Sequence, residues 1–134
     1  MNPTITRLRD AMNAHDLDAM AALFAPDYRS EQPVHPNRGF GGREQVVANW
    51  TAMFRGVPDL QLNVVTETTA GSECWSEWVW RGTYSDGSPF LMKGVTVMGL
   101  DDDGLISRAR LYMEPVEQDS APIDEAVRQL SASP

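Results

Sequence analysis

The chain has one cysteine, two histidines and no long apolar run, and each scarcity narrows its possible functions. Cys74 is the only cysteine among 134 residues, so an intrachain disulfide cannot form. It lies beside Trp75 in a strand-like segment with no nearby histidine, which predicts a buried, unreactive thiol. Neither histidine has acidic residues at the spacing of a metal site, so the sequence predicts no metal.

Positive charge is scarce as well. The 11 lysines and arginines are outnumbered by 19 acidic residues, which gives a net charge of -8 without any basic run. Such a composition argues against binding to nucleic acid or to an anionic membrane. The segment Met1–Asp16 carries charges throughout and lacks the apolar centre of a signal peptide, and no segment has the length of a membrane span. We therefore expect a soluble, cytoplasmic protein with no membrane partner.

Helix patterns dominate the first half of the chain. Apolar residues at helical spacing predict a helix over residues 5–12, and a second helix that includes Phe24 and ends at Pro26. Residues 28–34 are typical of a short strand, and a third helix is expected over residues 43–55. The first half therefore supplies three helices and one strand.

Four strands joined by tight turns dominate the second half. They are expected at residues 60–65, 74–84, 90–100 and 105–114. Helices gathered before a run of hairpin-connected strands predict an α+β domain. A strongly twisted sheet that wraps around helices leaves a cone whose open end can hold a ligand. We expect one domain over residues 1–116, followed over residues 117–134 by a polar linker and a short C-terminal helix or tail.

The last of these strands carries polar side chains at every second position. Ile106, Arg108, Arg110, Tyr112 and Glu114 share one parity, so they are expected on one face. Polar groups on one face suit a small-molecule pocket better than a dry core, which predicts that this face lines the pocket. A buried carboxylate beside a guanidinium there is suited to proton transfer. The alternative is a plain Arg110–Glu114 ion pair at a sheet edge.

Several short segments have the order and spacing of one known family. They are Asn13–Met20, Leu23–Tyr28, Gly41–Gln45, Val57–Leu60, Glu77–Trp78, Gly82–Thr83 and Asp103–Ile106. Through them the chain resembles, from about Ile5 to Glu114, the SnoaL-like polyketide cyclase branch of the nuclear transport factor 2-like superfamily. The resemblance implies a cone-shaped α+β fold, in which a curved, mostly antiparallel sheet packs on three helices from the N-terminal half and encloses a ligand pocket.

This superfamily hosts several activities, and the resemblance transfers their residues only in part. The acid of the polyketide cyclases matches Glu114, which is one methylene longer than the usual aspartate. The three functional positions of the steroid isomerases match Leu8, Gln32 and Thr96, so that acidic set is absent. Epoxide hydrolases use an Asp-Arg-Asp set, of which Arg110 and Glu114 imitate a part.

Further candidates come from the remaining polar and aromatic residues. His35 lies in a loop that the resemblance places at the mouth of the cone, where it is either a general base or an ordinary loop hydrogen-bonder. Tyr28 and Gln32 are predicted to contact substrate oxygens, and Trp50 and Trp78 to form aromatic walls around a flat ligand. The alternative for the aromatic residues is that they only fill the core or a dimer interface.

We interpret the chain as a small-molecule pocket protein with a hydrophobic ligand. One hypothesis is a cofactor-independent cyclase, isomerase or dehydratase for a polyketide-like or terpenoid substrate. In it Glu114, helped by His35, moves a proton next to a carbonyl, and Arg110 and Tyr112 stabilise the enolate oxygen. The others are a non-catalytic ligand-binding domain and an epoxide hydrolase of the limonene-epoxide type. The family commonly dimerises, so we predict a homodimer through one face of the four-strand sheet.

Overall fold

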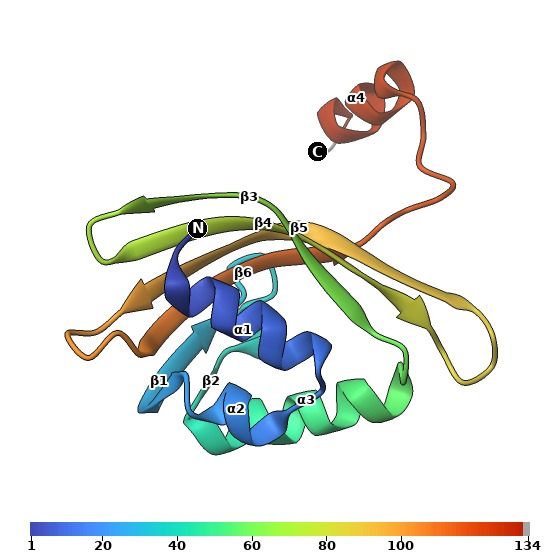
Figure 1. Ribbon diagram of the computed structural model, residues 1–134. Coiled ribbons are helices and arrows are strands. Elements are labelled where there is room, and N and C mark those ends of the chain that lie inside the picture. Colours follow the sequence, from blue (N-terminus) through green and yellow to red (C-terminus); the bar gives the residue numbers. More distant parts are fainter. Residues whose placement is uncertain (133–134) are drawn as a thin grey trace.

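One strongly curved sheet of six strands forms the frame of the molecule (Figure 1). The computed structural model describes residues 1–132. The strand order is β2-β1-β6-β5-β4-β3, and every neighbouring pair is antiparallel except β1 and β6, which are parallel. The strands are β1 (Phe24–Glu31), β2 (Phe40–Gly41), β3 (Gln61–Ala70), β4 (Glu73–Thr83), β5 (Pro89–Leu100) and β6 (Ile106–Pro115). The predicted α+β fold with a mostly antiparallel sheet is confirmed.

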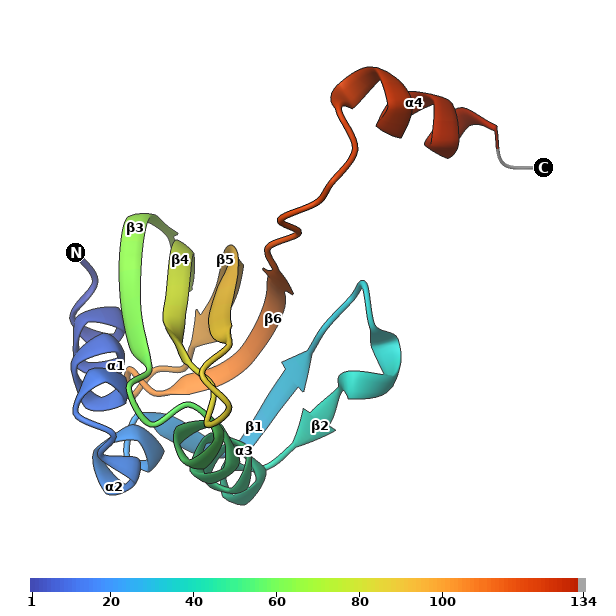
Figure 2. The ribbon, with the colours of Figure 1, turned by 90° about the vertical axis from the view of Figure 1, so that its right-hand side faces the viewer.

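Three helices cover the concave side of this sheet, and a fourth stands apart from it (Figure 2). They are α1 (Pro3–Asn13), α2 (Leu17–Ala21), α3 (Arg43–Gly56) and the separate α4 (Ile123–Ser131), with a short 3-10 turn at Pro36–Arg38 between β1 and β2. The main core lies between the first three helices and the concave face of the sheet. Ile5 and Leu8 from α1 meet Leu62 from β3 and Trp78 from β4 in that core, each no more than 1% exposed.

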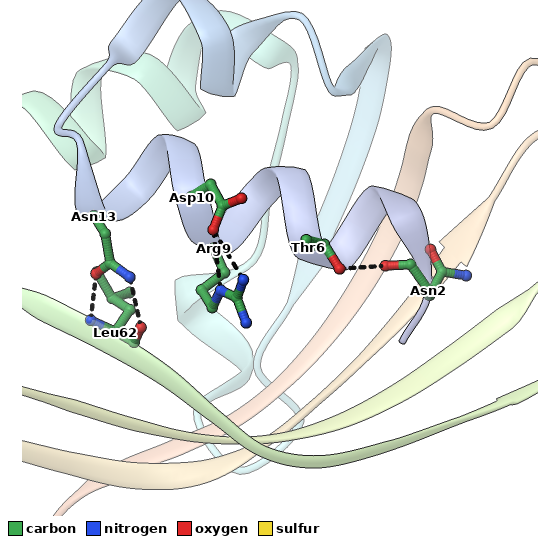
Figure 3. A network of polar contacts seen from close by, with 6 residues as sticks. All are labelled: Asn2, Thr6, Arg9, Asp10, Asn13 and Leu62. Carbon is green, nitrogen blue, oxygen red and sulfur yellow. Dashed lines mark hydrogen bonds and ion pairs between the residues drawn. The ribbon is translucent and has the colours of Figure 1, made fainter.

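Side-chain hydrogen bonds set the ends of the first two helices. The Asn2 side chain accepts from the Thr4 backbone N–H, and Asp16 accepts from the Ala19 backbone N–H, as expected for helix caps. At the other end of α1, the Asn13 amide bonds both the N–H and the C=O of Leu62, at 2.7 and 2.9 Å (Figure 3). Asn13 thus supplies the partners that an edge strand otherwise lacks.

The second helix is shorter than the sequence predicts. It ends at Ala21, and Phe24, which we had expected in the helix, begins β1 instead. The reason is tertiary: the Ile106 N–H donates to the Leu23 carbonyl at 2.8 Å, and Phe24 pairs with Ile106 of β6. Strand pairing with a distant segment therefore overrides the local helical pattern. The structure also adds β2 inside the expected loop and extends β3 to residue 70.

The strand pairing of the sheet is interrupted by register shifts. The β3–β4 register shifts between Val64 and Thr66, and the β5–β6 register shifts between Gly99 and Leu100. At Gly94 of β5 an added Cβ would overlap the Tyr112 carbonyl oxygen of β6, so only glycine allows this close approach. No helix within residues 1–132 is long and apolar enough to cross a membrane.

Candidate functional site

A cavity of about 250 Å³ lies between the concave face of the sheet and helices α1 and α3. Ligand pockets commonly measure ~300–1,000 Å³, so this cavity is suited to a small ligand. Its lining residues are mostly aliphatic, aromatic or methionine side chains. They are Leu8, Met12, Phe24, Tyr28, Ser30, Gln32, Arg38, Phe40, Val46, Asn49, Trp50, Met53, Trp78, Trp80, Met92, Thr96, Met98, Leu111 and Met113.

Strand β6 presents its apolar face to this cavity, contrary to our expectation. Leu111 and Met113 line the cavity, and the alternation of a strand therefore places Arg110, Tyr112 and Glu114 on the other face of the sheet. The predicted parity was wrong because the concave side is the core side, and the core takes the apolar residues of β6.

A register shift explains why Ile106 is buried although the polar residues of the same parity are not. Leu100 pairs with Ile106 and Gly99 pairs with Arg108, so one residue of β6 is extra between the two pairs. Ile106 is fully buried, whereas Arg108 is exposed. The alternation changes sides there, which the spacing in the sequence does not reveal.

The polar residues on the outer face of β6 form other contacts than those expected. The Arg110 guanidinium lies 3.7 Å from the Glu73 carboxylate of β4, and Arg108 lies 3.8 Å from the same carboxylate. Tyr112 is 38% exposed. Within the described residues the alternative Arg110–Glu114 ion pair is not formed.

His35 and Glu114 are brought together, but neither lines the cavity, and Glu114 lies on the outer face of the sheet. The His35 Nε2 and Glu114 Oε1 atoms are 2.6 Å apart, and the two side chains are 33% and 45% exposed. The parallel pairing of β1 and β6 causes this meeting, because His35 follows the end of β1 and Glu114 lies near the end of β6. Gln32 and Arg38, on either side of His35 in the chain, both line the cavity.

Strand β1 and the loop after it supply a polar edge to the cavity. Tyr28, Ser30 and Gln32 alternate toward it, and the first two are no more than 3% exposed. Burial raises the pKa of the Tyr28 phenol, and a side-chain interaction with Ser30 offsets part of that rise. Tyr28 therefore stays protonated and can donate a hydrogen bond. Tyr28 and Gln32 both line the cavity, and their contact with substrate oxygens stays a prediction.

Tryptophan side chains form the wall of the cavity opposite this polar edge. Trp50 of α3 packs edge-on against Trp80 of β4, with ring centroids 5.3 Å apart. The Trp78 Nε1–H donates to the Thr96 hydroxyl oxygen at 3.0 Å, which leaves the Thr96 hydroxyl hydrogen free. The Trp80 Nε1–H is buried and has no hydrogen-bond partner among the described residues. Trp50 and Trp78 both line the cavity, and their role as walls around a ligand stays a prediction.

Sequence reasoning missed several lining residues. It did not nominate Trp80, Arg38 or Ser30, although the parity that Trp80 shares with Trp78, and Ser30 with Tyr28, was a usable signal. Arg38 had no such signal, because its position depends on the path of the loop. The three positions that match the isomerase set, Leu8, Gln32 and Thr96, all line the cavity, and none of them carries an acid.

The polar groups of the cavity are mainly hydrogen-bond donors. Among the residues that line it in the described part of the chain there is no aspartate, glutamate, histidine or lysine, and Arg38 alone is formally charged. Within residues 1–132 no three His, Cys, Asp or Glu side chains are grouped to hold a metal ion. The arrangement is therefore suited to binding an apolar body that carries acceptor oxygens.

Solved structures with the same fold come from several bacteria. IdmH from Streptomyces antibioticus, a suggested polyketide cyclase, has a TM-score of 0.73 at 25% identity, over 83% of this chain and 89% of that chain. RV0760c from Mycobacterium tuberculosis, in complex with estradiol-17beta-hemisuccinate, has a TM-score of 0.71 at 21% identity, over 87% and 92% of the two chains.

A third structure is a hypothetical protein with a ketosteroid isomerase-like fold from Catenulispora acidiphila, in complex with trimethylamine. It has a TM-score of 0.71 at 19% identity, over 82% of this chain and 85% of that chain. No curated protein sequence is significantly similar to the chain. Residues 5–109 match the SnoaL-like domain family, in agreement with the curved sheet and its three helices. The chain therefore belongs to the SnoaL-like domain family, within the nuclear transport factor 2-like superfamily.

Proposed function

We propose that the protein binds a small, flat, largely apolar molecule in the cavity through hydrogen bonds to an acceptor oxygen. The observation that carries this proposal is the Trp80 Nε1–H, a buried donor without a partner at an otherwise apolar wall. An unpaired buried donor costs about 1–3 kcal/mol, and an acceptor on a ligand recovers that cost. The Tyr28 phenol, with its raised pKa, adds a second donor.

The chemical class of the ligand follows from the lining. Stacked and edge-on aromatic rings bind flat ring systems well, and methionines adapt to their outline. Polyketide-like and terpenoid molecules combine such a body with carbonyl or hydroxyl oxygens. The binding of estradiol-17beta-hemisuccinate by RV0760c supports a role for this fold in holding apolar polycyclic molecules.

The test uses the intrinsic fluorescence of the cavity tryptophans. Acetonaphthone, a two-ring ketone, is titrated against the protein, with naphthalene as the probe that lacks an acceptor oxygen. We expect saturable quenching by acetonaphthone. Trp80→Phe keeps an aromatic ring but removes the N–H together with the five-membered ring of indole. We expect it to weaken acetonaphthone binding by about tenfold more than naphthalene binding, because naphthalene loses only apolar contact.

Tyr28→Phe is the second variant, in case Trp80→Phe perturbs packing against Trp50. It removes one hydroxyl group and retains the aromatic ring. Circular dichroism and thermal melting establish that each variant folds before it is titrated. Quenching that does not saturate, or equal binding by wild type and both variants, would overturn the proposed binding mode.

Acid–base catalysis is a second candidate, favoured by the 2.6 Å contact between His35 and Glu114. In this candidate Glu114 orients the imidazole, and His35 exchanges a proton with the carbon next to a ligand carbonyl. Arg110, Tyr112 and Glu114 all lie on the opposite face of the sheet from the cavity. This candidate therefore requires the ligand to reach His35 at the cavity edge beside Gln32 and Arg38, and it gives Arg110 and Tyr112 no part in stabilising an enolate. An epoxide-opening reaction at this site would need a water molecule held by His35 and Glu114.

Deuterium incorporation into the acetyl methyl group of acetonaphthone tests this candidate. Wild-type protein in heavy water should accelerate the exchange, and His35→Gln and Glu114→Gln should each abolish that acceleration while leaving the quenching titration unchanged. If wild type does not accelerate exchange although it binds the ketone, the catalytic candidate is lost and the binding function stands.

A further inference from the structure

Arg38 is the one formally charged residue among those that line the cavity within the described chain. It lies in the turn between β1 and β2, is exposed, and forms no ion pair with a carboxylate in residues 1–132. Its one side-chain hydrogen bond runs from Nη1 to the Gln32 Oε1 atom at 3.3 Å. An unpaired guanidinium therefore borders a cavity that is otherwise apolar and uncharged.

Gln32 complements this cation. Because its amide oxygen accepts from Arg38, the two N–H bonds of its amide nitrogen are left to face other partners. Gln32 is half-buried and Arg38 is exposed, which marks the edge of the cavity that communicates with solvent. The edge thus offers guanidinium and amide donors together. These donors stand out in a chain whose net charge is -8.

The apolar wall faces this donor edge from the α3 side. Trp50 and Met53 of α3 and Met92 of β5 are half-buried lining residues, so they also border the open part of the cavity. A ligand that enters here meets rings and methionines with its body and the guanidinium with one end. The planar fork of arginine matches the two oxygens of a carboxylate.

We propose that the ligand is an organic anion, an aromatic or polycyclic body with a carboxylate that Arg38 and Gln32 bind at the cavity edge. This inference rests on the proposed binding function and specifies the class of its ligand. Arg38 acts as a specificity-determining residue, because the rest of a strongly acidic protein repels anions. The buried donors Tyr28 and Trp80 would then hold a second oxygen deeper in the cavity.

The experiment compares two probes that share one ring system. Naphthoate carries a carboxylate, and acetonaphthone carries a methyl group in place of one carboxylate oxygen. Both are titrated by tryptophan quenching against wild type, Arg38→Gln and the matched control Arg55→Gln, an exposed arginine of α3 outside the cavity. We expect Arg38→Gln to weaken naphthoate binding by about five- to tenfold and to leave acetonaphthone binding unchanged.

Ionic strength provides an independent readout. Naphthoate affinity for wild type should fall as sodium chloride is raised, and this dependence should be smaller in Arg38→Gln. Equal naphthoate affinity in wild type and Arg38→Gln, with acetonaphthone still bound, overturns the anion preference alone. Failure of both probes to bind wild type overturns this inference together with the proposed function, so the two failures are distinguishable.

Discussion

Burial acts on two titratable side chains of the core in the same direction. It raises the pKa of the Tyr28 phenol, and it raises the pKa of the Cys74 thiol, with the Glu67 carboxylate also contributing to the rise at Cys74. Both groups therefore stay protonated at neutral pH. The prediction that Cys74 is buried is confirmed, because its side chain is fully inaccessible. As pH rises past their unfolded pKa values, the unfolded chain ionises first and stability falls.

Asp59 is a carboxylic acid whose pKa the folded structure lowers. Its carboxylate accepts the Thr83 backbone N–H at 2.7 Å, and this hydrogen bond lowers the pKa of Asp59 below its ordinary value of 3.8. The resulting stabilisation is present above that ordinary value, and it is lost as pH falls through the folded pKa. We predict that Asp59→Asn is less stable than wild type at neutral pH.

The stability difference between wild type and Asp59→Asn should shrink as the solution is acidified below the ordinary pKa of an aspartate. Urea unfolding at a series of pH values measures it. Asp102→Asn is the control, an exposed carboxylate for which the described residues show no side-chain hydrogen bond. A difference that stays constant with pH would mean that the Asp59 charge is not the cause.

At the scale of elements, one residue ties α1 to the edge of the sheet. Asn13 bonds both backbone groups of Leu62, a position with 0% exposure (Figure 3). Asn13→Ala leaves a buried N–H and C=O without partners, and we predict a loss of about 1–3 kcal/mol in the free energy of unfolding. Chemical denaturation measures this loss.

Asn63→Ala is the matched control, because Asn63 is exposed on the same strand. We expect it to change the free energy of unfolding by less than about 0.5 kcal/mol. If the two variants lose equal stability, the paired bonds of Asn13 are not what holds α1 to β3.

Helix α4 differs from the other elements because none of its described residues is buried. Ile123, Val127 and Leu130 follow one another at helical spacing and are 73%, 51% and 80% exposed. Figure 2 shows the helix away from the sheet. We predict that a chain ending at residue 116 unfolds at the same temperature as the whole chain, as measured by calorimetry. A large drop would show that the tail belongs to the folded domain.

Element by element, the sequence was most informative where patterns are long and regular. The helices α1 and α3 and the strands β4, β5 and β6 lie close to their predicted places, because local periodicity and turn residues act over many positions. The prediction from sequence was wrong at Phe24, which joins a strand because it pairs with β6. The prediction also missed β2, which is only two residues long. Both depend on partners distant in the sequence.

At the scale of the whole molecule, the outer face of the sheet carries exposed aromatic residues. Trp75 is 43% exposed and Tyr112 is 38% exposed, beside the Glu73–Arg110 contact. Exposed aromatic residues with charged neighbours are typical of protein interfaces. We keep the prediction of a homodimer that forms through this face.

Light scattering after size exclusion measures the assembly. Wild type should have twice the mass of one chain, and Tyr112→Glu should shift it to the mass of one chain because a charged side chain replaces an aromatic ring of the proposed interface. Val34→Glu, in the exposed loop after β1, is the control that should remain dimeric. Wild type at the mass of a single chain would contradict the dimer.

The sequence alone determined the class of fold and the order of the main elements, because hydrophobic periodicity and turn chemistry are local properties, and its short motifs indicated the family by resemblance. The tertiary structure decided which face of β6 looks into the cavity. Strand alternation defines two faces but does not say which one the helices cover, and the shifted register before Arg108 changes the alternation. It also decided that Arg38 borders the cavity and that His35 meets Glu114, because both depend on the path of a loop beside a distant parallel strand.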